Sequence, residues 1–350
     1  MRRRSPVARA ALAVPSWIFG AGVVLRNRWY ERPGAAEAAP VPVVSVGNLA
    51  AGGTGKTPLV AWLVSRLLER GRHPAVVSRG YGGRAGPGPL LVSTGTGPRV
   101  DARACGDEPH LLARMLPGAI VVVGADRVEA ARSAAAAGAG VVVLDDGFQH
   151  RRLVRDLDIV VLDGRAPFDA GLLPSGILRE PPRSVSRAGV VVLTRVAERD
   201  TAADAIAAVR RAGFPGLIVR SGHKRAGFFD AAGRACPVPA RALAFCGIAD
   251  PELFRADLKR AGVEIVRFRA FRDHHRYSGA LWDALRAAAR AEGLTLVTTD
   301  KDLSRVEAAA GASIASAPLA VLRIEAAVWE PAPLLEAVLR AIAAHEVGRA

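Results

Sequence analysis

A glycine-rich run ending in Gly-Lys-Thr is the segment of this 350-residue chain with the clearest chemical meaning. Residues 43–57 read VVSVGNLAAGGTGKT, an apolar half that predicts a buried strand, followed by glycines. In such a loop, backbone N–H groups close on phosphate oxygens, the lysine reaches the β- and γ-phosphates, and the threonine hydroxyl suits Mg²⁺. We therefore expect ATP or a similar nucleotide to bind here with Mg²⁺. The residues expected to hold them are Gly52, Gly53, Thr54, Gly55, Lys56 and Thr57.

One position departs from the pattern G-x-x-x-x-G-K-T, because Ala50 stands where the first glycine belongs. The glycine doublet at 52–53 supplies the flexibility instead. Residues 58–68 read as a helix with Pro58 in its first turn, and a helix N-terminus attracts an anion. Strand, loop and helix thus follow in the order that a phosphate-binding loop requires.

Paired carboxylates provide the next chemical signal. Asp145 and Asp146 follow an apolar run at 141–144, where an Asp of a phosphate-loop enzyme holds Mg²⁺ directly or through water. A plain turn also favours Asp and Gly, but the upstream glycine-rich loop favours the metal. Asp107 and Glu108 precede a helix, where Asp107 can cap the helix or accept a proton from an attacking hydroxyl. The residues alone leave both roles of Asp107 open.

Further polar side chains follow predicted strands. Arg79 and Tyr81, in a glycine-rich segment, either clamp an anionic or sugar substrate or lie in a surface loop. Arg179 and Glu180 either neutralise a transferring phosphate and support Mg²⁺ or form a solvated ion pair. In the segment 273–277, DHHRY, the adjacent histidines point different ways, so we expect one of them to orient a carboxylate rather than both to bind a metal.

Short β-branched runs alternate with helical stretches over the first part of the chain. Continuous apolar strands suit a parallel sheet covered on both faces, and the alternation predicts a doubly wound α/β domain. Ligands bind such folds at the carboxyl ends of the strands, where the polar motifs fall. The predicted strands are 41–46, 75–78, 120–123, 141–144, 159–162 and 190–193, and the predicted helices are 58–70, 108–115 and 125–137.

The pattern changes at residue 217. Two short segments, 217–220 and 225–229, are separated by polar residues and followed by a turn, which predicts a β-ribbon between two domains. A second α/β set follows, with strands at 242–245, 264–268, 294–298 and 319–324. We expect an N-terminal helix at 1–35, a P-loop NTPase-like kinase domain at 36–216, the ribbon at 217–239, and a smaller α/β domain at 240–350 whose terminal helix returns to the first domain.

The N-terminus combines three arginines at 2–4 with a mostly apolar stretch at 8–25. Four interpretations compete: a signal peptide, a transmembrane helix, an interfacial helix that meets acidic headgroups and a core helix of a soluble enzyme. The nucleotide loop just downstream argues against export, and an arginine, a proline and a glycine interrupt the apolar stretch. We therefore expect a membrane-associated helix on an anionic surface.

The net charge of +15 favours anionic partners such as phosphate-bearing substrates, acidic lipid headgroups or nucleic acid. A nucleic-acid binder would explain the charge but not the paired carboxylates, so we expect no nucleic-acid partner. Cys105, Cys236 and Cys246 are too few and too scattered for a disulfide framework or a zinc site. Their number favours a reducing compartment.

Two other classes of phosphate-loop protein lack their signature residues here. A GTPase needs Asn-Lys-x-Asp after a late strand, where this chain reads TRVA at 194–197. An ATPase of the partitioning type places a lysine before the Gly-Gly doublet, where this chain has Ala51.

Taken together, the motifs resemble the tetraacyldisaccharide 4'-kinase family of lipid A biosynthesis. The resemblance covers almost the whole chain in order, and DDGFQH at 145–150 is its most specific piece. The other motifs are VGN at 46–48, GGTGKT at 52–57, SRGYG at 78–82, GDE at 106–108, LREP at 178–181, DHH at 273–275 and TDKD at 299–302.

The resemblance implies ATP- and Mg²⁺-dependent phosphorylation of the 4'-hydroxyl of an acylated glucosamine disaccharide 1-phosphate, which gives lipid IVA. It implies two α/β domains joined by a β-ribbon. It also implies a peripheral, monotopic protein whose N-terminal helix lies at the cytoplasmic face of the bacterial inner membrane. We expect this protein to be a monomer.

By motif, the resemblance assigns roles to individual residues. Asp107 is the expected catalytic carboxylate and His274 its partner from the other domain, chosen over His275 on the family pattern alone. The expected metal-shell residues are Thr57, Asp145, Asp146 and Glu180. The expected residues for substrate or transferring phosphate are Asn48, Arg79, Tyr81, His150 and Arg179. Since the catalytic pair spans two domains, we expect the cleft between them to close before transfer.

Overall fold

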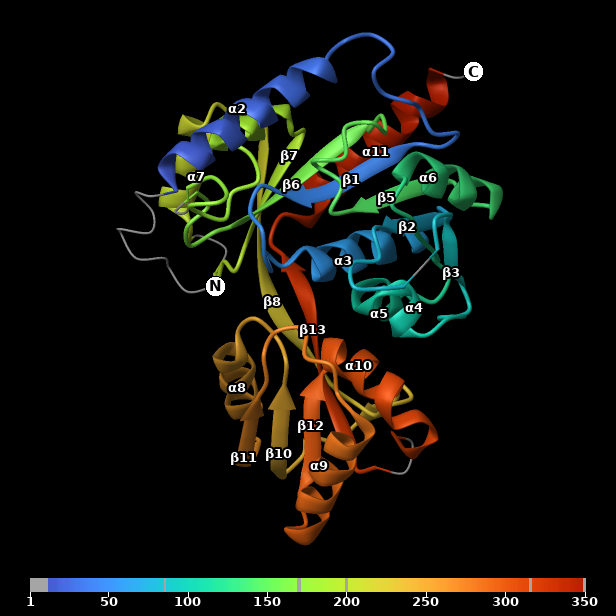
Figure 1. Cartoon of the computed structure of the whole chain (residues 1–350), viewed down its shortest axis with the longest axis vertical. Coiled ribbons are helices and arrows are strands. Elements are labelled where there is room, and N and C mark those ends of the chain that lie inside the picture. The colour runs from blue at the N-terminus through green and yellow to red at the C-terminus, as the bar shows by residue number, and fades with distance from the viewer. Residues whose placement is uncertain (1–11, 85, 169–170, 199–200, 315–316, 349–350) are drawn as a thin grey trace.

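The computed structural model describes residues 12–84, 86–168, 171–198, 201–314 and 317–348. One 13-stranded sheet runs through two lobes that are stacked along the long axis of the molecule (Figure 1). The strand order is β11-β10-β12-β13-β8-β7-β6-β1-β5-β2-β4-β3, and β9 pairs with β8 alone. Most neighbours are parallel, and the antiparallel pairs are β3–β4, β8–β13 and β8–β9. The predicted mixed α/β class is confirmed.

The large lobe carries the strands that the sequence predicted, with one addition. Its strands are β1 (Val43–Asn48), β2 (Pro74–Ser78), β3 (Leu90–Thr94), β4 (Ile120–Val123), β5 (Val141–Asp145), β6 (Leu157–Asp163) and β7 (Val190–Thr194). Every residue of β1, β2, β4, β5 and β7 is buried, as expected for valine-rich strands covered on both faces. The edge strand β3 was not predicted, because its short run LLVST lies beside glycines and prolines.

Helices cover both faces of the large-lobe sheet. On one face pack α3 (Lys56–Leu68), α5 (Asp107–Met115) and the C-terminal α11 (Pro331–Val347), which contribute to one apolar core with alternate strand residues. The other face is covered by α6 (Arg127–Ala136) and α7 (Ala203–Arg211). Short helices α4 (Ala102–Cys105) and η1 (Pro182–Arg187) lie in connections. The carboxyl ends of the central strands therefore open between these layers, where the polar motifs lie.

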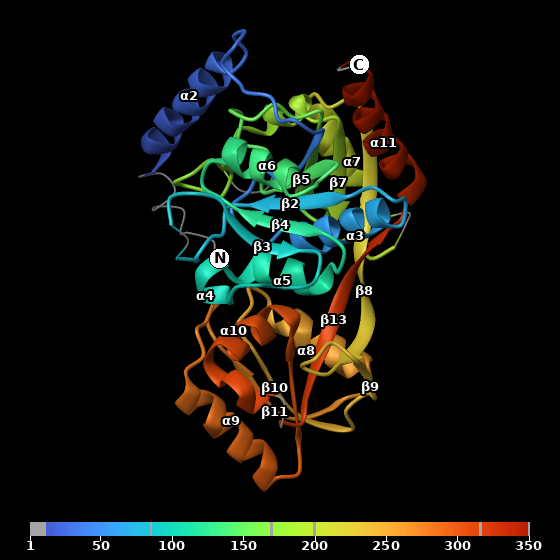
Figure 2. The same ribbon diagram turned by 90° about the vertical axis from the view of Figure 1, so that its right-hand side faces the viewer.

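The small lobe has its own parallel strands and cores. Its strands are β10 (Arg241–Cys246), β11 (Glu264–Ala270) and β12 (Thr295–Thr299), and its helices are α8 (Pro251–Arg260), α9 (Gly279–Ala291), α10 (Asp300–Ala310) and η2 (Gly311–Ile314). Phe245 and Trp282 are fully buried in one of its two apolar clusters. In Figure 2, α10 lies directly below α4 and α5 of the large lobe, so this helix faces the cleft between the lobes.

Two long strands join the lobes. β8 (Leu217–Phe229) pairs in parallel with β7 and then antiparallel with β13 (Leu319–Val328), so both strands run from one lobe into the other (Figure 1). After a turn, the short β9 (Ala235–Cys236) pairs back onto β8. The prediction of two short segments at 217–220 and 225–229 was wrong, because the polar residues between them continue the strand and pair with β13.

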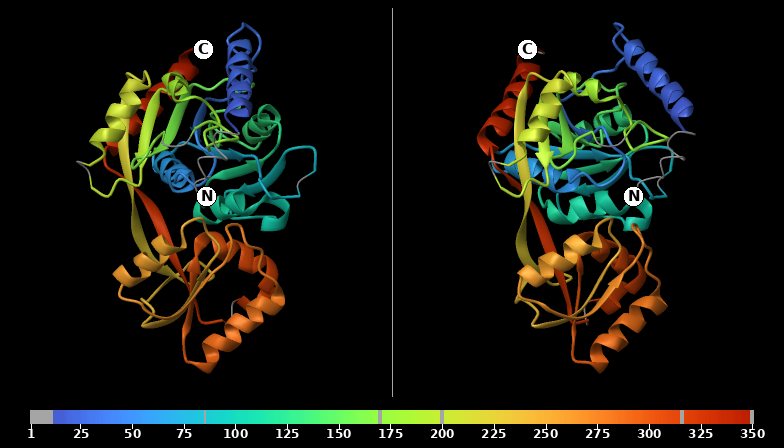
Figure 3. Two further views of the ribbon diagram at one scale, coloured as in Figure 1. Left: turned by 60° about the vertical axis from the view of Figure 1, so that its left-hand side comes forward. Right: turned by 90° about the vertical axis from the view of Figure 1, so that its left-hand side faces the viewer.

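The N-terminal helix α2 (Ala13–Trp29) lies along the outside of the large lobe (Figure 3). Its outer face exposes large apolar side chains that are 49% to 75% accessible: Val14, Trp17, Ile18, Leu25 and Trp29. Its inner side is tied to the lobe by Ser16, whose hydroxyl donates to the Leu172 carbonyl. The arginines at 2–4 lie outside the described residues. Among the described helices, none combines the length and apolar character needed to cross a bilayer.

Candidate active site

The glycine-rich segment connects β1 directly to α3. Gly55 precedes the helix with φ +82°, a left-handed conformation that favours glycine, and Lys56 begins the helix. Thr54 is held on two sides, because Asn48 Nδ2 donates to its hydroxyl at 3.0 Å and the Thr194 hydroxyl donates to its carbonyl at 2.7 Å. The buried strand therefore fixes the loop at the N-terminus of α3, the end of a helix that attracts anions.

Two charged side chains converge on Asp146 beside this loop. Lys56 Nζ lies 3.3 Å from Asp146 Oδ1, and Arg179 Nη1 donates to Asp146 Oδ2 at 2.8 Å. Burial raises the pKa of Asp146, but the charges of Lys56 and Arg179 outweigh burial and the net pKa is lowered. Asp146 is therefore ionised at neutral pH and holds both cations near the loop.

Asp145 has a different environment. It is 3% exposed, and the Ser78 hydroxyl donates to its Oδ2 at 3.3 Å. Burial, followed by the nearby negative charge of Glu108, raises the pKa of Asp145 to about 7. A buried carboxylate with so few donors is stabilised when a cation lies beside it.

The oxygen atoms near the loop fit Mg²⁺, which prefers one or two carboxylates together with phosphate and water oxygens. Asp145 supplies a buried carboxylate that lacks a cationic hydrogen-bond partner among the described residues, and Thr57 supplies a hydroxyl at the start of α3. Within the described ranges, no group of three or more His, Cys, Asp or Glu side chains is arranged to hold a metal by itself. The protein alone offers a partial ligand set, as a metal shared with a nucleotide requires.

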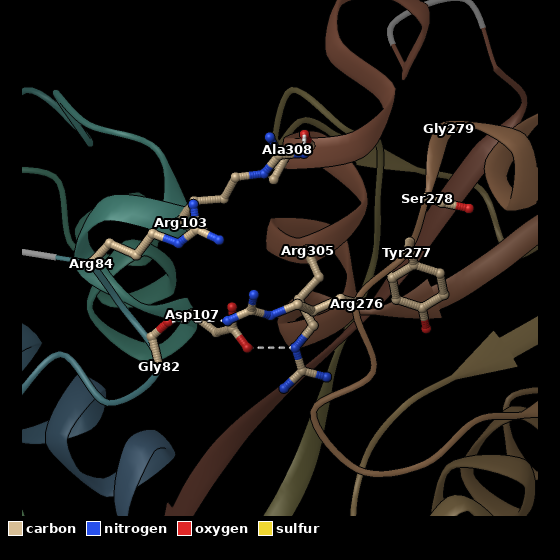
Figure 4. A pocket seen from close by; sticks show the side chains of 11 residues that line it. Gly82, Arg84, Arg103, Asp107, Arg276, Tyr277, Ser278, Gly279, Arg305 and Ala308 are labelled. Carbon is tan, nitrogen blue, oxygen red and sulfur yellow. Dashed lines mark hydrogen bonds and ion pairs between the residues drawn. The ribbon is translucent and has the colours of Figure 1, made fainter.

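A second cluster lies between the lobes. Asp107, the first residue of α5, accepts a hydrogen bond at 2.6 Å from Nε of Arg305, which lies on α10 of the small lobe (Figure 4). His274 Nδ1 lies 3.7 Å from the same carboxylate oxygen. Burial raises the pKa of Asp107, but hydrogen bonds from His274 and Arg305 outweigh it, so the net pKa is lowered. The cluster thus presents an ionised carboxylate at the interlobe cleft.

Arg305 is held rigidly in this position. Its side chain is only 3% exposed, its Nη1 donates to the Gly247 carbonyl at 2.7 Å and to Asp302 at 3.1 Å, and its Nη2 lies 3.2 Å from His274 Nδ1. Asp302 itself is fixed because the Tyr277 hydroxyl donates to its Oδ1. One guanidinium group therefore orients both Asp107 and His274.

The two adjacent histidines face different surroundings. His274 has φ +58°, a strained conformation for a non-glycine residue, and its ring points to Asp107 of the other lobe. The ring of His275 instead stacks on Phe271 with centroids 4.5 Å apart. The structure therefore brings His274, and not His275, to the carboxylate of Asp107.

Glu108 connects the interlobe cluster with the glycine-rich loop. Its Oε1 accepts from Lys301 of the small lobe at 2.7 Å and from the Thr57 hydroxyl at 3.4 Å. Burial raises the pKa of Glu108, but Lys301 and then Lys56 lower it, and the net pKa is lowered. Asp107 and Glu108, neighbours at the start of α5, therefore contact the interlobe cluster and the glycine-rich loop.

Other predicted residues lie at varying distance from this centre. Tyr81 is 79% exposed, and its ring meets His274 edge-on with centroids 6.4 Å apart. Arg79 is exposed at the end of β2. Burial and the charge of Arg127 lower the pKa of His150 to about 4, so this imidazole is neutral at pH 7.

The contacts of Glu180 differ from those expected of a metal-shell carboxylate. It is fully buried, and its two oxygens accept from Arg187, at 2.9 and 3.2 Å, and from Asn27 of α2 at 2.8 Å. Gln149 also donates to it at 3.1 Å. In this structure Glu180 therefore belongs to a network that ties α2 to the DDGFQH segment.

Two residues in or beside the site, Arg305 and Arg127, were not singled out from the sequence. Arg305 lies on α10, far along the chain from Asp107, so local patterns do not reveal it. Lys301 belongs to the TDKD motif, but its contact with Glu108 was not predicted. Arg127 begins α6, four positions after β4 ends at Val123, is 4% exposed and lies near Asp145. An arginine in the loop-to-helix segment that follows a buried strand is a signal that could have identified Arg127.

Comparisons with known proteins agree on one family. A family model described as tetraacyldisaccharide-1-P 4'-kinase matches residues 8–343. The tetraacyldisaccharide 4'-kinase of Chlorobium limicola is 40% identical over 313 residues, which cover 87% of this chain and 89% of the relative. That of Anaeromyxobacter dehalogenans is 42% identical over 348 residues, with 95% and 90% covered. A crystal structure of LpxK from Aquifex aeolicus in complex with ATP matches with a TM-score of 0.78 at 28% identity, covering 95% of this chain and 99% of that chain.

Proposed function

The chain belongs to the tetraacyldisaccharide-1-P 4'-kinase family, and from this premise we propose the reaction that it catalyses. It transfers the γ-phosphate of ATP to the 4'-hydroxyl of tetraacyldisaccharide 1-phosphate and so forms the 4'-phosphorylated lipid A precursor, lipid IVA. The observation that carries the proposal is the family match over residues 8–343, nearly the whole chain. The geometry supports the proposal, because helix α5 carries both the ionised Asp107 at the interlobe cleft and Glu108, which contacts Thr57 of the glycine-rich loop.

The glycine-rich loop holds the ATP phosphates. The phosphates would accept hydrogen bonds from backbone N–H groups of residues 52–55 and from the N-terminus of α3. Lys56, whose Nζ lies 3.3 Å from Asp146 in this structure, would contact the β- and γ-phosphates as well. Thr57, Asp145 and Asp146 are the residues that would hold Mg²⁺. Bound there, the metal neutralises charge that develops on the phosphates during transfer. Arg179, which is paired with Asp146, supplies a further positive charge.

Asp107 acts as the general base. Its carboxylate is ionised and lines the cleft, so it accepts the proton of the 4'-hydroxyl as the new O–P bond forms and the bond from the γ-phosphorus to ADP breaks. His274 lies 3.7 Å from this carboxylate and orients it, and Arg305 fixes both groups. Lowering of the pKa of Asp107 keeps the base unprotonated at neutral pH.

The acceptor's sugar is held by residues around the base and the DDGFQH segment. Arg79 and Tyr81 line the approach. His150 lies near the buried Arg127, which in turn lies near Asp145, and these side chains supply further polar groups. Glu180 supports the site from behind, because it anchors Gln149, whose amide also donates to the Asn48 carbonyl at 2.9 Å. Recognition through polar groups leaves the acyl chains outside the cleft.

Helix α2 anchors the enzyme at a membrane surface. Five large apolar side chains on its outer face are exposed to solvent, with Trp17 at 75% and Ile18 at 60%. Arg26 and Arg28 lie in its last turn, where they can meet acidic headgroups. We expect this helix to hold the protein at the cytoplasmic face of the inner membrane, since ATP and the lipid acceptor meet there.

A transfer assay tests the proposal. Labelled ATP, Mg²⁺ and tetraacyldisaccharide 1-phosphate are supplied in detergent to the full-length protein and its variants. We expect Asp107→Asn to lower kcat by about 10²- to 10⁴-fold and Lys56→Ala to abolish most transfer. Matched controls are Asp283→Asn and Lys224→Ala, whose side chains are 71% and 61% exposed on other surfaces. Absence of transfer by the wild type would exclude the proposed activity, and full activity of Asp107→Asn would exclude the assigned base.

A further inference from the structure

A cavity of about 460 Å³ lies between the lobes, beside the proposed base (Figure 4). Its wall includes Asp107 and four arginines, two from each lobe: Arg84 and Arg103 from the large lobe, and Arg276 and Arg305 from the small lobe. Asp107 is the only acidic side chain among the described residues of this wall. We call this cavity the arginine pocket.

Among the residues that the structure describes, no carboxylate pairs with three of the four guanidinium groups. Arg103 Nη2 donates to the Ala308 carbonyl at 2.6 Å, and Arg276 Nη2 donates to the Gly82 carbonyl at 3.4 Å, so each reaches across the cleft to a neutral acceptor. Arg84 has no side-chain hydrogen bond or ion pair to any residue that the structure describes. Arg305 is the one pocket arginine that described carboxylates neutralise, namely Asp107 and Asp302. The pocket thus carries an excess of positive charge.

Some surface arginines are neutralised by carboxylates: Arg152 pairs with Glu37 at 2.8 Å and with Asp126 at 2.6 Å. What distinguishes the pocket is that three guanidinium groups without a described carboxylate partner gather around one cavity. Uncompensated like charges around one cavity repel each other and lower the potential energy of an anion placed between them. Guanidinium groups bind phosphate with two parallel hydrogen bonds, so several of them around one cavity select a phosphate group over a single carboxylate.

We propose that the arginine pocket binds the 1-phosphate of the acceptor and so fixes the distal end of the disaccharide relative to Asp107. The inference rests on the proposed function, since that function supplies an acceptor with a phosphate at one end and the reacting hydroxyl at the other. The ATP phosphates are a poorer match, because Lys56 and the glycine-rich loop do not line this pocket. Because the arginines come from both lobes, a phosphate bound here also holds the lobes together.

Arg84→Ala gives the sharpest test, because this exposed side chain forms no hydrogen bond or ion pair with any described residue, so its loss should leave the fold intact. Full-length wild type, Arg84→Ala, Arg103→Ala and Arg276→Ala are assayed with two acceptors, the tetraacyldisaccharide with and without its 1-phosphate. The matched control is Arg290→Ala, an exposed arginine on α9 outside the pocket. Thermal unfolding of each variant is measured in parallel, since Arg103 and Arg276 also bridge the lobes.

We expect the wild type to prefer the phosphorylated acceptor. Each pocket variant should lose roughly 10- to 100-fold in kcat/KM on that acceptor, as expected for a hydrogen bond to a charged group. The loss should lie mostly in KM and should be small on the acceptor without the phosphate. Arg290→Ala should match the wild type on both.

The assay distinguishes failure of the proposed kinase function from failure of the pocket assignment. No transfer by the wild type to either acceptor would refute the proposed function itself. Transfer without preference for the 1-phosphate, or equal losses by Arg84→Ala on both acceptors, would refute the pocket assignment and leave the kinase function intact. The assay is repeated in neutral micelles and in micelles with phosphatidylglycerol. If the effect of Arg84→Ala appears only with phosphatidylglycerol, the pocket binds a bulk lipid headgroup and the assignment to the acceptor is wrong.

Discussion

Replacing Arg305 by glutamine removes a positive charge from the proposed base while leaving a hydrogen-bonding side chain. In the wild type, Arg305 Nε donates to Asp107 at 2.6 Å, and its side chain is only 3% exposed, so solvent screens the pair weakly. This contact favours the ionised carboxylate and lowers the pKa of Asp107. Without it the carboxylate binds a proton more readily, and Asp107 is a base only at higher pH.

The size of the effect follows from the strength of the lost contact. A hydrogen bond between charged groups contributes about 1.5 to 3 kcal/mol, and each pKa unit corresponds to about 1.4 kcal/mol. The acid limb of kcat/KM should therefore move upward by roughly one to two pH units. Arg305→Gln should be strongly impaired in acid and should recover most of its loss as the pH rises.

The measurement is a pH profile of kcat/KM with labelled ATP and saturating Mg²⁺. Arg305→Lys is the matched variant, because it keeps the charge but loses the planar fork that also reaches Gly247 and His274. Its acid limb should move less than that of the glutamine variant. A loss of equal size at every pH, with no movement of the acid limb, would show that Arg305 supports the fold alone and would refute the reasoning.

Three further predictions concern the contact between the two lobes, the pH dependence of stability and the membrane anchor. Glu108→Gln keeps the contact with Thr57 but loses the charge that pairs with Lys301. Small-angle scattering should therefore show a more open average shape, and the transfer assay should show a raised KM for the lipid acceptor. The pKa values of Asp107 and Glu108 are lowered in the folded protein, so their ion pairs contribute their full stability above the ordinary carboxyl pKa. That stability is lost as the pH falls through the pKa values of the folded state. Unfolding monitored by circular dichroism should show a lower free energy of unfolding in acid. The double change Trp17→Ser and Ile18→Ser should shift protein from sedimented vesicles to the supernatant without lowering transfer to a detergent-dispersed acceptor, and unchanged partitioning would contradict the anchor.

The sequence predicted the parts of the site that are local. Contiguous runs of valine, glycine and aspartate predicted the order of β1, glycine-rich loop and α3. They also predicted that two carboxylates, Asp145 and Asp146, lie at the end of β5. Parallel strands end at one edge of a sheet, so polar residues after such runs meet without further information.

Contacts between the lobes were less accessible to sequence reasoning. Arg305 reaches a carboxylate 198 positions away, and nothing in its neighbourhood marks that contact. Lys301 lies in the TDKD motif, but the motif does not indicate that its partner is Glu108, 193 positions away. The long strand β8 was divided in the prediction because its polar middle is read as a break, whereas pairing with the distant β13 satisfies its backbone. Long-range pairing thus decided what local patterns could not.

The placement of Asp107 and Glu108 suits a helix that lies between two proposed sites, one for ATP and one for the lipid acceptor. Both residues lie in the first turn of α5, so their side chains diverge from neighbouring positions, one toward Arg305 and the other toward Thr57. Thr57 is a residue that would hold the metal of bound ATP, while Asp107 lines the pocket proposed for the acceptor. A shift of the small lobe moves Lys301 and Arg305 together, because both belong to α10. In this structure both contacts are already made. If the lobes open to admit substrates, as we expect, their closure would restore the contacts of Asp107 and Glu108 in a single movement before phosphoryl transfer.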